Sequence, residues 1–231
     1  MESSNPSQTL ENHLERIYMR DPVLNGQQHI DNRNLTRELS HDIGAVVPGK
    51  TVLLYGSSLV YYTSLIVMKE TLRRLPSIAV VDGANRFDAY RLARMAQIDG
   101  RDPLDILNRV YLSRVFTAFQ MDGLLTRGVE PFLDEAKTKV LIVLGLLHTF
   151  YDEQISVREA EKSLAGINAK FSGMKKNGIS ILLASENLTP AQKQRQAFYK
   201  RMQAMADDVY EVSSGPYEGI VWNRQKRRLA R

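Results

Sequence analysis

The stretch Gly44–Leu65, GAVVPGKTVLLYGSSLVYYTSL, sets a pattern that the rest of the chain repeats. Its apolar run TVLLY predicts a short strand over Thr51–Tyr55 that ends at Gly56. A helix is predicted next, over Thr63–Leu75, because Pro76 follows directly and cannot continue a helix. A strand, a glycine turn and a helix are the opening of a βαβ unit.

Outward from this stretch, short apolar runs alternate with longer amphipathic segments. Such an alternation favours right-handed crossovers and a mainly parallel sheet flanked by helices. Asp208–Val212 and Gly219–Asn223 are predicted to close the chain as a hairpin of antiparallel edge strands. Thr189 and Pro190 predict an N-cap and a first helical position. Further strands are predicted at residues 78–81, 110–115, 140–144 and 179–184, and helices at 88–97, 156–176 and 190–206.

This α/β core is expected to span residues 41–223. Residues 1–40 are predicted to form an N-terminal helical arm, because Leu10, Leu14 and Ile17 recur at helical spacing. Residues 224–231 are interpreted as a basic C-terminal tail.

Composition excludes several classes of site. The chain has no cysteine, which excludes disulfide scaffolds, Cys-ligated zinc, iron–sulfur clusters and thiol catalysis. With only four histidines, a zinc site would need an unusual set of ligands. Its longest apolar run, Val140–Leu147, is far shorter than the ~20 residues of a membrane span. The polar first residues do not resemble a secretory signal. We expect a cytoplasmic protein, or one in the nucleoid or nucleus if it associates with DNA.

The net charge of +5 comes from 31 basic and 26 acidic residues, and its position is informative. The last eight residues contain five basic side chains and no acid, so the rest of the chain is neutral. A second basic segment, residues 187–206, also lacks acids and includes Phe198 and Tyr199. Basic groups pair with phosphates and aromatic rings stack on unpaired bases. The residues expected to contact DNA are Lys193, Arg195, Lys200, Arg201, Arg224, Lys226, Arg227, Arg228 and Arg231.

Two alternatives remain open for these segments. The tail is equally understood as a solvated terminus that aids solubility. The segment 190–206 is equally understood as an amphipathic helix whose Phe198 and Met202 face the core. A third polar group, His148, Asp152 and Glu153, follows a buried strand and is either a metal or acid–base site or an ordinary polar loop.

The sequence from about residue 40 to residue 223 resembles the ATPase core of the RecA-like recombinases, the strand-exchange proteins and their paralogues. Gly44–Leu65 is similar to the entry into that core, and Val140–Leu144 falls at its Walker B strand. An ordinary doubly wound α/β domain also accounts for Gly56 and Asp82 after the first two strands. Further segments that carry the resemblance are residues 80–92, Asn108–Leu125 (NRVYLSRVFTAFQMDGLL), with its aromatic–x–x–Arg–x–Phe pattern, and residues 156–184.

Three catalytic features of the family are missing from this sequence. A phosphate loop reads G-x-x-x-x-G-K-[ST], with the lysine on the β- and γ-phosphates. Gly56 and Thr63 occupy the outer positions here, but Tyr61 and Tyr62 replace the Gly-Lys pair. The last two departures are Ala84 in place of the catalytic glutamate and Leu144 in place of the metal-holding aspartate.

The resemblance and these losses together predict a catalytically inactive RecA-like paralogue. It would hold no cofactor or metal, and Tyr55, Tyr61 and Tyr62 would form an aromatic plug in the vacated nucleotide site. It would act in DNA recombination or repair by binding DNA, through the tail and helix 190–206, an active recombinase, or a second copy of itself. The alternatives are a scaffold that acts through protein contacts without DNA, and an enzyme that uses the edge of the sheet for other chemistry.

Overall fold

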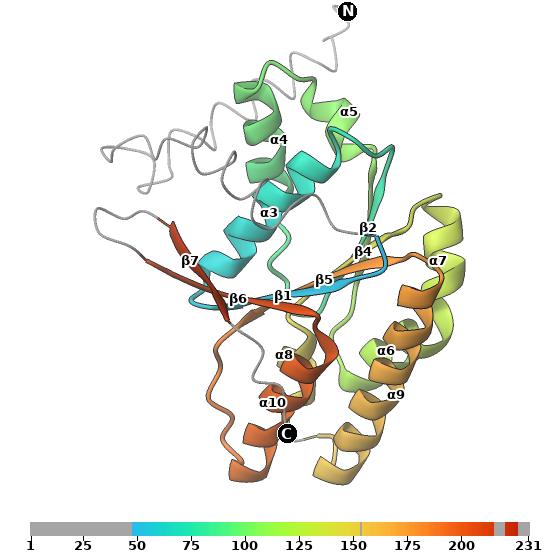
Figure 1. Cartoon of the computed structure of the whole chain (residues 1–231), viewed down its shortest axis with the longest axis vertical. Coiled ribbons are helices and arrows are strands. Elements are labelled where there is room, and N and C mark those ends of the chain that lie inside the picture. Colours follow the sequence, from blue (N-terminus) through green and yellow to red (C-terminus); the bar gives the residue numbers. More distant parts are fainter. Residues whose placement is uncertain (1–47, 153, 215–219, 226–231) are drawn as a thin grey trace, which may run out of the picture. The chain divides into compact units, whose positions relative to one another are not determined.

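The computed structural model describes residues 48–152, 154–214 and 220–225, which form a seven-stranded sheet with helices on both faces (Figure 1). Across the sheet the strand order is β3-β2-β4-β5-β1-β6-β7, and every neighbouring pair is parallel except β6 and β7. The expected α/β fold with a mainly parallel sheet is confirmed. The strands are β1 Thr51–Gly56, β2 Ile78–Asp82, β3 Val110–Arg114, β4 Val140–Leu144, β5 Ser180–Glu186, β6 Asp208–Ser214 and β7 Ile220–Gln225.

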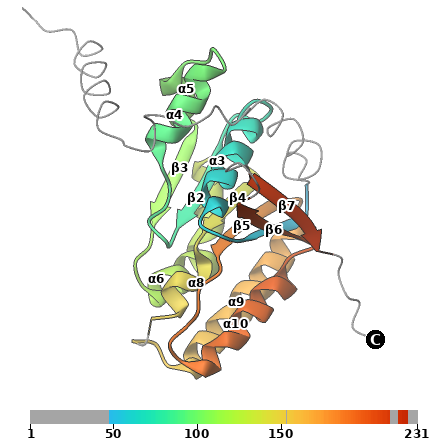
Figure 2. The ribbon, with the colours of Figure 1, turned by 90° about the vertical axis from the view of Figure 1, so that its left-hand side faces the viewer.

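The helices cover the two faces unequally (Figures 1 and 2). One face carries α3 Leu59–Thr71 and α4 Ala89–Ile98, with α5 Pro103–Leu107 beside α4. The other face carries α6 Ala118–Gly123, α7 Val129–Glu135, α8 Leu146–Phe150, α9 Val157–Lys176 and α10 Gln196–Met205. A π-helical turn, η1 Leu124–Gly128, joins α6 to α7, and a 3₁₀ turn, η2 Lys193–Arg195, leads into α10.

Each face of the sheet has its own apolar core, and the strand period of two divides the residues between them. In β4, Val140, Ile142 and Leu144 pack on the side of α3 and α4. Leu141 and Val143 pack on the side of α6 to α10. A strand that is buried on both faces needs apolar side chains at every position, which is why β4 reads VLIVL without alternation.

The start of α9 follows from its sequence. The Ser156 side chain accepts a hydrogen bond from the backbone N–H of Glu159, and the Glu159 carboxylate accepts one from the backbone N–H of Ser156. This capping box satisfies N–H groups that the helix itself leaves unpaired. The same device starts α6, where Thr117 and Gln120 are the paired residues.

Three expectations about the elements were wrong. The expected C-terminal hairpin of β6 and β7 forms, but β6 is not an antiparallel edge strand, because it pairs parallel with β1 on its other side. The helix expected from Thr63 begins earlier, at Leu59. Thr189 and Pro190 cap no helix, since the chain stays irregular until η2 and α10 begins at Gln196.

The predicted ends of the chain are mostly outside the described residues. The arm at residues 1–40 lies there, as do Lys226, Arg227, Arg228 and Arg231 of the tail. Arg224 is described, and it belongs to β7 and not to a tail. Among the helices of the described residues, none has the length and apolar character needed to cross a bilayer.

Candidate functional site

The carboxyl ends of the parallel strands meet at one edge of the sheet, where ligands bind in folds of this kind. Ala84 lies two residues after the end of β2, and Leu144 is the last residue of β4. The two residues are neighbours at this edge. The backbone N–H of Gly83 donates to the Leu144 carbonyl over 2.8 Å. A Cβ placed on Gly145 would lie 2.3 Å from the Ala84 Cβ, so the two turns are in close contact. The structure therefore brings together two positions that the sequence had singled out separately.

The segment from Gly56 to Thr63 does not form an open loop. After Gly56 the chain turns directly into α3, and the N–H groups of Val60 and Tyr61 donate to the Ser57 and Ser58 carbonyls, at 3.1 and 3.2 Å. The Thr63 hydroxyl donates to the Leu59 carbonyl over 2.9 Å. These three groups, which would face a phosphate in a nucleotide loop, are thus used inside the helix.

Gly56 has a structural role that involves no ligand. Its φ is 132°, and a Cβ there would lie 2.1 Å from the Val212 carbonyl oxygen of β6. The next residue, Ser57, donates its N–H to that same oxygen over 2.9 Å. Only glycine combines this φ with such a close approach.

Tyr61 fills the space where the sequence predicted an aromatic plug. Its side chain is only 5% exposed and packs edge-on against the His148 imidazole, with 6.2 Å between ring centroids. The Arg86 guanidinium lies over the Tyr61 ring, 5.8 Å from its centroid, and is 3.9 Å from the Glu186 carboxylate. Tyr62 is half-buried beside it, under the Arg91 guanidinium.

The third tyrosine is not part of the plug, so that part of the prediction was wrong. Tyr55 packs in the opposite core, edge-on against Tyr199 at 5.4 Å, and its hydroxyl donates to Glu211. Tyr55 lies on a strand and Tyr61 on the helix that follows, and the two side chains point to opposite faces of the sheet.

The polar atoms of the plug are held away from water. Within the described residues, neither the buried Tyr61 hydroxyl nor His148 Nδ1 has a hydrogen-bond partner of ordinary geometry. Burial raises the pKa of the Tyr61 hydroxyl well above its usual range, despite the opposing effect of the Glu186 backbone. Burial also lowers the pKa of His148, which Glu186 partly offsets. Both side chains are therefore neutral at pH 7.

Asp82 has a bonding role that the sequence analysis missed. Its carboxylate is buried at the end of β2 and accepts three backbone N–H groups, from Ala84, Arg86 and Phe87, at 3.2, 3.1 and 2.9 Å. It fixes the turn that follows β2. A short acidic side chain directly after a strand is the signal that could have indicated this role.

One of the basic residues expected to contact DNA is unavailable. Arg195 is only 1% exposed, and its guanidinium donates to the backbone carbonyls of Phe150 and Ile155. Its Nε donates to Gln192 over 2.9 Å. Because its side chain is buried, Arg195 cannot reach a phosphate, and it instead ties the segment after β4 to η2.

The other described basic residues of this set are exposed, and they differ in whether they form an ion pair. Lys193 and Lys200 are exposed, whereas Arg201 pairs with Glu161 at 2.8 Å. Arg224 pairs with Asp208 across β6 and β7. Phe198 is fully buried, as the amphipathic alternative predicted, so it cannot stack on a base.

The group His148, Asp152 and Glu153 does not make a metal site in the described part of the chain. No three His, Asp or Glu side chains there lie close enough together to hold an ion, and Glu153 is outside the described residues. His148 is committed to the contact with Tyr61.

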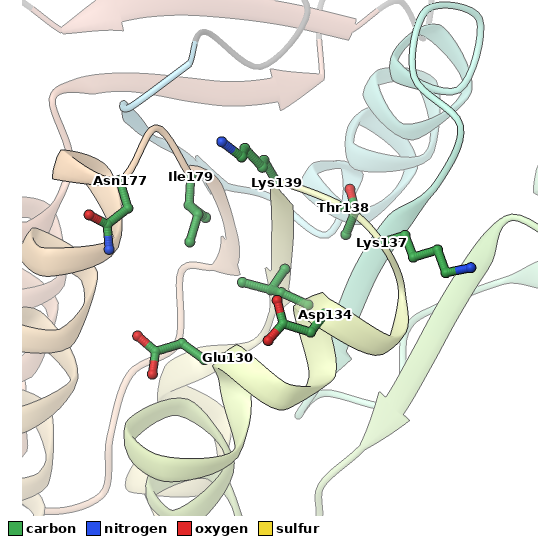
Figure 3. Close-up of a pocket in the computed structure, with 8 residues that line it drawn as sticks. Glu130, Asp134, Lys137, Thr138, Lys139, Asn177 and Ile179 are labelled. Atoms are coloured by element: carbon green, nitrogen blue, oxygen red, sulfur yellow. The ribbon is translucent and has the colours of Figure 1, made fainter.

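A shallow hollow lies at the opposite, amino end of the sheet (Figure 3). It is lined by Glu130 and Asp134 of α7, by Lys137–Lys139 before β4, and by Asn177 and Ile179 before β5. The hollow is open, mixed in charge and far from the strand ends where such folds bind ligands. It adds nothing to the site described above.

No protein-family model matches the sequence, and no curated protein matches it either.

Proposed function

We propose that this chain is a catalytically inactive RecA-like paralogue that acts in DNA recombination or repair by binding DNA, an active recombinase, or both. The observation that carries the proposal is Tyr61. At the position where the family's phosphate loop would hold nucleotide, its ring packs against His148 and Arg86. The helix begins at Leu59, which leaves no loop for phosphates.

The positions of the missing catalytic groups support the same proposal. Ala84 lies against Gly145, and a Cβ on that glycine would already collide with it. The half-buried Ala84 itself presents no carboxylate at this contact. Leu144 is fully buried and contributes to the core. Loss of the lysine and both carboxylates removes the groups that position and stabilise a transferring phosphoryl.

The first test is ATP turnover. The purified chain, with and without single-stranded DNA, should release no phosphate above the level of a buffer control, and ATP with magnesium should not raise its Tm. Hydrolysis that depends on the protein would overturn the proposal.

The second test measures DNA binding against salt. The full chain should bind at low salt, and a truncation after Gln225 keeps β7 whole while it removes Lys226–Arg231. Its loss of four basic side chains should reduce the salt slope by up to about three units, because each neutralised phosphate of a single strand contributes about 0.7. A slope that does not change would assign no DNA contact to the tail.

A scaffold that acts through protein contacts is the second candidate. Ile98 and Leu104, on α4 and α5, are both more than half exposed, and large apolar side chains on a surface favour protein contacts. Light scattering of the full chain at low salt should show a defined oligomer under this candidate. Substitution of both residues by glutamate should then dissociate it.

A further inference from the structure

The exits of β2 and β3 form one continuous surface at the edge of the sheet. β3 is the outermost strand, and its carboxyl end leads through Val115 to α6 (Figure 2). The N–H of Val115 donates to the Asp82 carbonyl over 3.1 Å, and the Arg114 guanidinium reaches the Phe87 carbonyl at 3.5 Å. We call this the β2–β3 exit surface, defined by Arg86, Tyr90, Arg91, Arg114, Phe116 and Phe119.

Aromatic side chains on this surface are unusually open to solvent. Phe116 is 68% exposed and Phe119 63% exposed, while Tyr90 is about half exposed. Phenylalanine is among the residues most often buried, and an exposed group of large apolar side chains marks a binding surface.

The turn that carries Phe116 is fixed by hydrogen bonds. The Gln120 side-chain oxygen accepts the N–H groups of Phe116 and Thr117 at 2.8 and 3.2 Å. The Thr117 hydroxyl accepts the N–H of Gln120 in return. A partner would therefore meet a backbone that is already ordered, which lowers the entropy cost of binding.

Three arginines belong to the same part of the fold: Arg86 follows β2, Arg91 is in α4, and Arg114 ends β3 two residues before Phe116. The side chains of Arg86, Arg91 and Arg114 are each about half exposed. Their carboxylate contacts are to Glu186 at 3.9 Å, Asp88 at 3.0 Å and Asp82 at 3.8 Å. Asp82 already accepts three backbone N–H groups, and Asp88 also caps α4. A guanidinium has five N–H donors, so each arginine keeps donors for an external acceptor.

We propose that the β2–β3 exit surface binds single-stranded nucleic acid. Unpaired bases would stack on Phe116 and Phe119, and Arg86, Arg91 and Arg114 would hold the phosphates. Exposed rings among basic side chains are the arrangement by which proteins bind single strands with little sequence preference. A duplex offers its phosphates but keeps its bases stacked inside, so it would use the arginines alone. The proposal does not rest on the RecA-like assignment, and it concerns a different surface from α10.

The test is fluorescence anisotropy of labelled oligo(dT), oligo(rU) and duplex DNA with the full chain. Phe116→Ala with Phe119→Ala should weaken oligo(dT) binding at least tenfold, since each base–aromatic stack contributes appreciably to affinity. The control, Leu75→Ala, removes an exposed apolar side chain outside this surface and should leave affinity unchanged. Phe116→Trp should bind like the unaltered chain, with quenching of the added tryptophan by oligo(dT). The oligo(rU) arm decides whether RNA and DNA share the surface.

Arg114→Gln provides a readout of the phosphate contacts. It should reduce the dependence of log K on log salt by about 0.7 units for a single strand. Circular dichroism reports whether the double alanine variant folds. If it does not fold, Arg114→Gln and Phe116→Trp still test whether this surface binds single-stranded nucleic acid.

Several results would overturn the proposal. One is oligo(dT) binding that the double alanine variant retains in full, and another is tighter binding of duplex than of single strands. A change of oligomeric mass in that variant without a change in oligo(dT) affinity would assign the surface to protein contacts. If Lys193→Ala with Lys200→Ala abolishes binding while the phenylalanine variants do not, the inference fails and DNA binding by α10 stands.

Discussion

The two halves of the sheet's carboxyl edge use similar side chains in opposite ways. At the ends of β1, β4 and β5, an aromatic ring and an arginine are buried, with Tyr61 against His148 and Arg195 on two backbone carbonyls. At the ends of β2 and β3, Phe116 and Arg114 are exposed. In the first half the aromatic ring and the arginine contact other groups of the protein, whereas in the second the aromatic and basic side chains are exposed to solvent. The difference shows that composition alone does not separate a closed site from an open one.

The largest effect should come from removal of the buried arginine. Arg195→Ala should lower the free energy of unfolding by roughly 3–5 kcal/mol, because the buried carbonyls of Phe150 and Ile155 lose their donors. Denaturation in urea measures it, and the exposed neighbour Lys193→Ala should change stability by less than about 0.5 kcal/mol. Equal stability of the two variants would mean that this half is not closed in the way described.

Gly56→Ala should have the next largest effect. A Cβ at this φ meets the Val212 carbonyl, so we expect a loss of roughly 2–3 kcal/mol in the free energy of unfolding. Gly100→Ala is the control, since its φ is also positive but no atom lies within 4 Å of the added Cβ, and it should cost about 1 kcal/mol. If Gly100 proved the more sensitive position, the tight contact between β1 and β6 would be in error.

Tyr61→Phe should act in the opposite direction. It removes a buried hydroxyl whose contact with the Glu186 backbone lacks ordinary hydrogen-bond geometry, and it keeps the ring that fills the site. We expect a gain of about 1 kcal/mol in thermal unfolding experiments, because an unsatisfied buried polar group is costly. The same change at the half-exposed Tyr90 should be neutral. A loss of stability in Tyr61→Phe would indicate that the hydroxyl has a partner after all, such as a bound ligand.

The smallest effect should appear as pH dependence. Burial lowers the pKa of His148, so the unfolded chain takes up a proton at this residue at a higher pH than the folded chain does. Stability from this group is complete above the unfolded pKa of about 6.5 and falls as the pH drops through the range below it. The groups that face the imidazole are Tyr61, Arg86, Asp82 and Glu186.

Comparison of the unaltered chain with His148→Leu between pH 7.5 and pH 5 isolates this contribution. The other three histidines are present in both proteins, so the difference of their two stability curves belongs to residue 148. The variant should show the shallower fall with acid. Parallel curves would place His148 in contact with solvent.

Sequence reasoning located the sheet well, for identifiable reasons. β4 and the centre of β5 are continuous apolar runs, which are typical of strands covered by helices on both faces. Ser156 and Glu159 mark the start of α9. The sequence analysis placed the start of α3 too late, because Gly56 and Thr63 were interpreted as the outer positions of a phosphate loop. The apolar residues Leu59 and Val60 already belong to the helix.

The site was harder to predict because burial depends on where a helix begins. The helix was expected to start at Pro190, whereas it begins at Gln196. Nothing in the local sequence distinguishes Lys193, which is exposed, from Arg195, which is buried two residues later. The acceptors of Arg195 are carbonyls at residues 150 and 155, a contact that only the folded chain creates. Arg86 and Glu186, which flank Tyr61, were missed for the same reason.

The position of β1 in the sheet also bears on how the chain is made. β1 is an internal strand, yet its two neighbours are β5 and β6, which come near the end of the described residues. During synthesis β1 leaves the ribosome long before either neighbour exists, and both of its edges stay unpaired while most of the chain follows. An apolar strand with open edges is prone to pair with other chains. The nascent protein should therefore depend on chaperones until β6 emerges, and release of chains that end before β6 should yield aggregates.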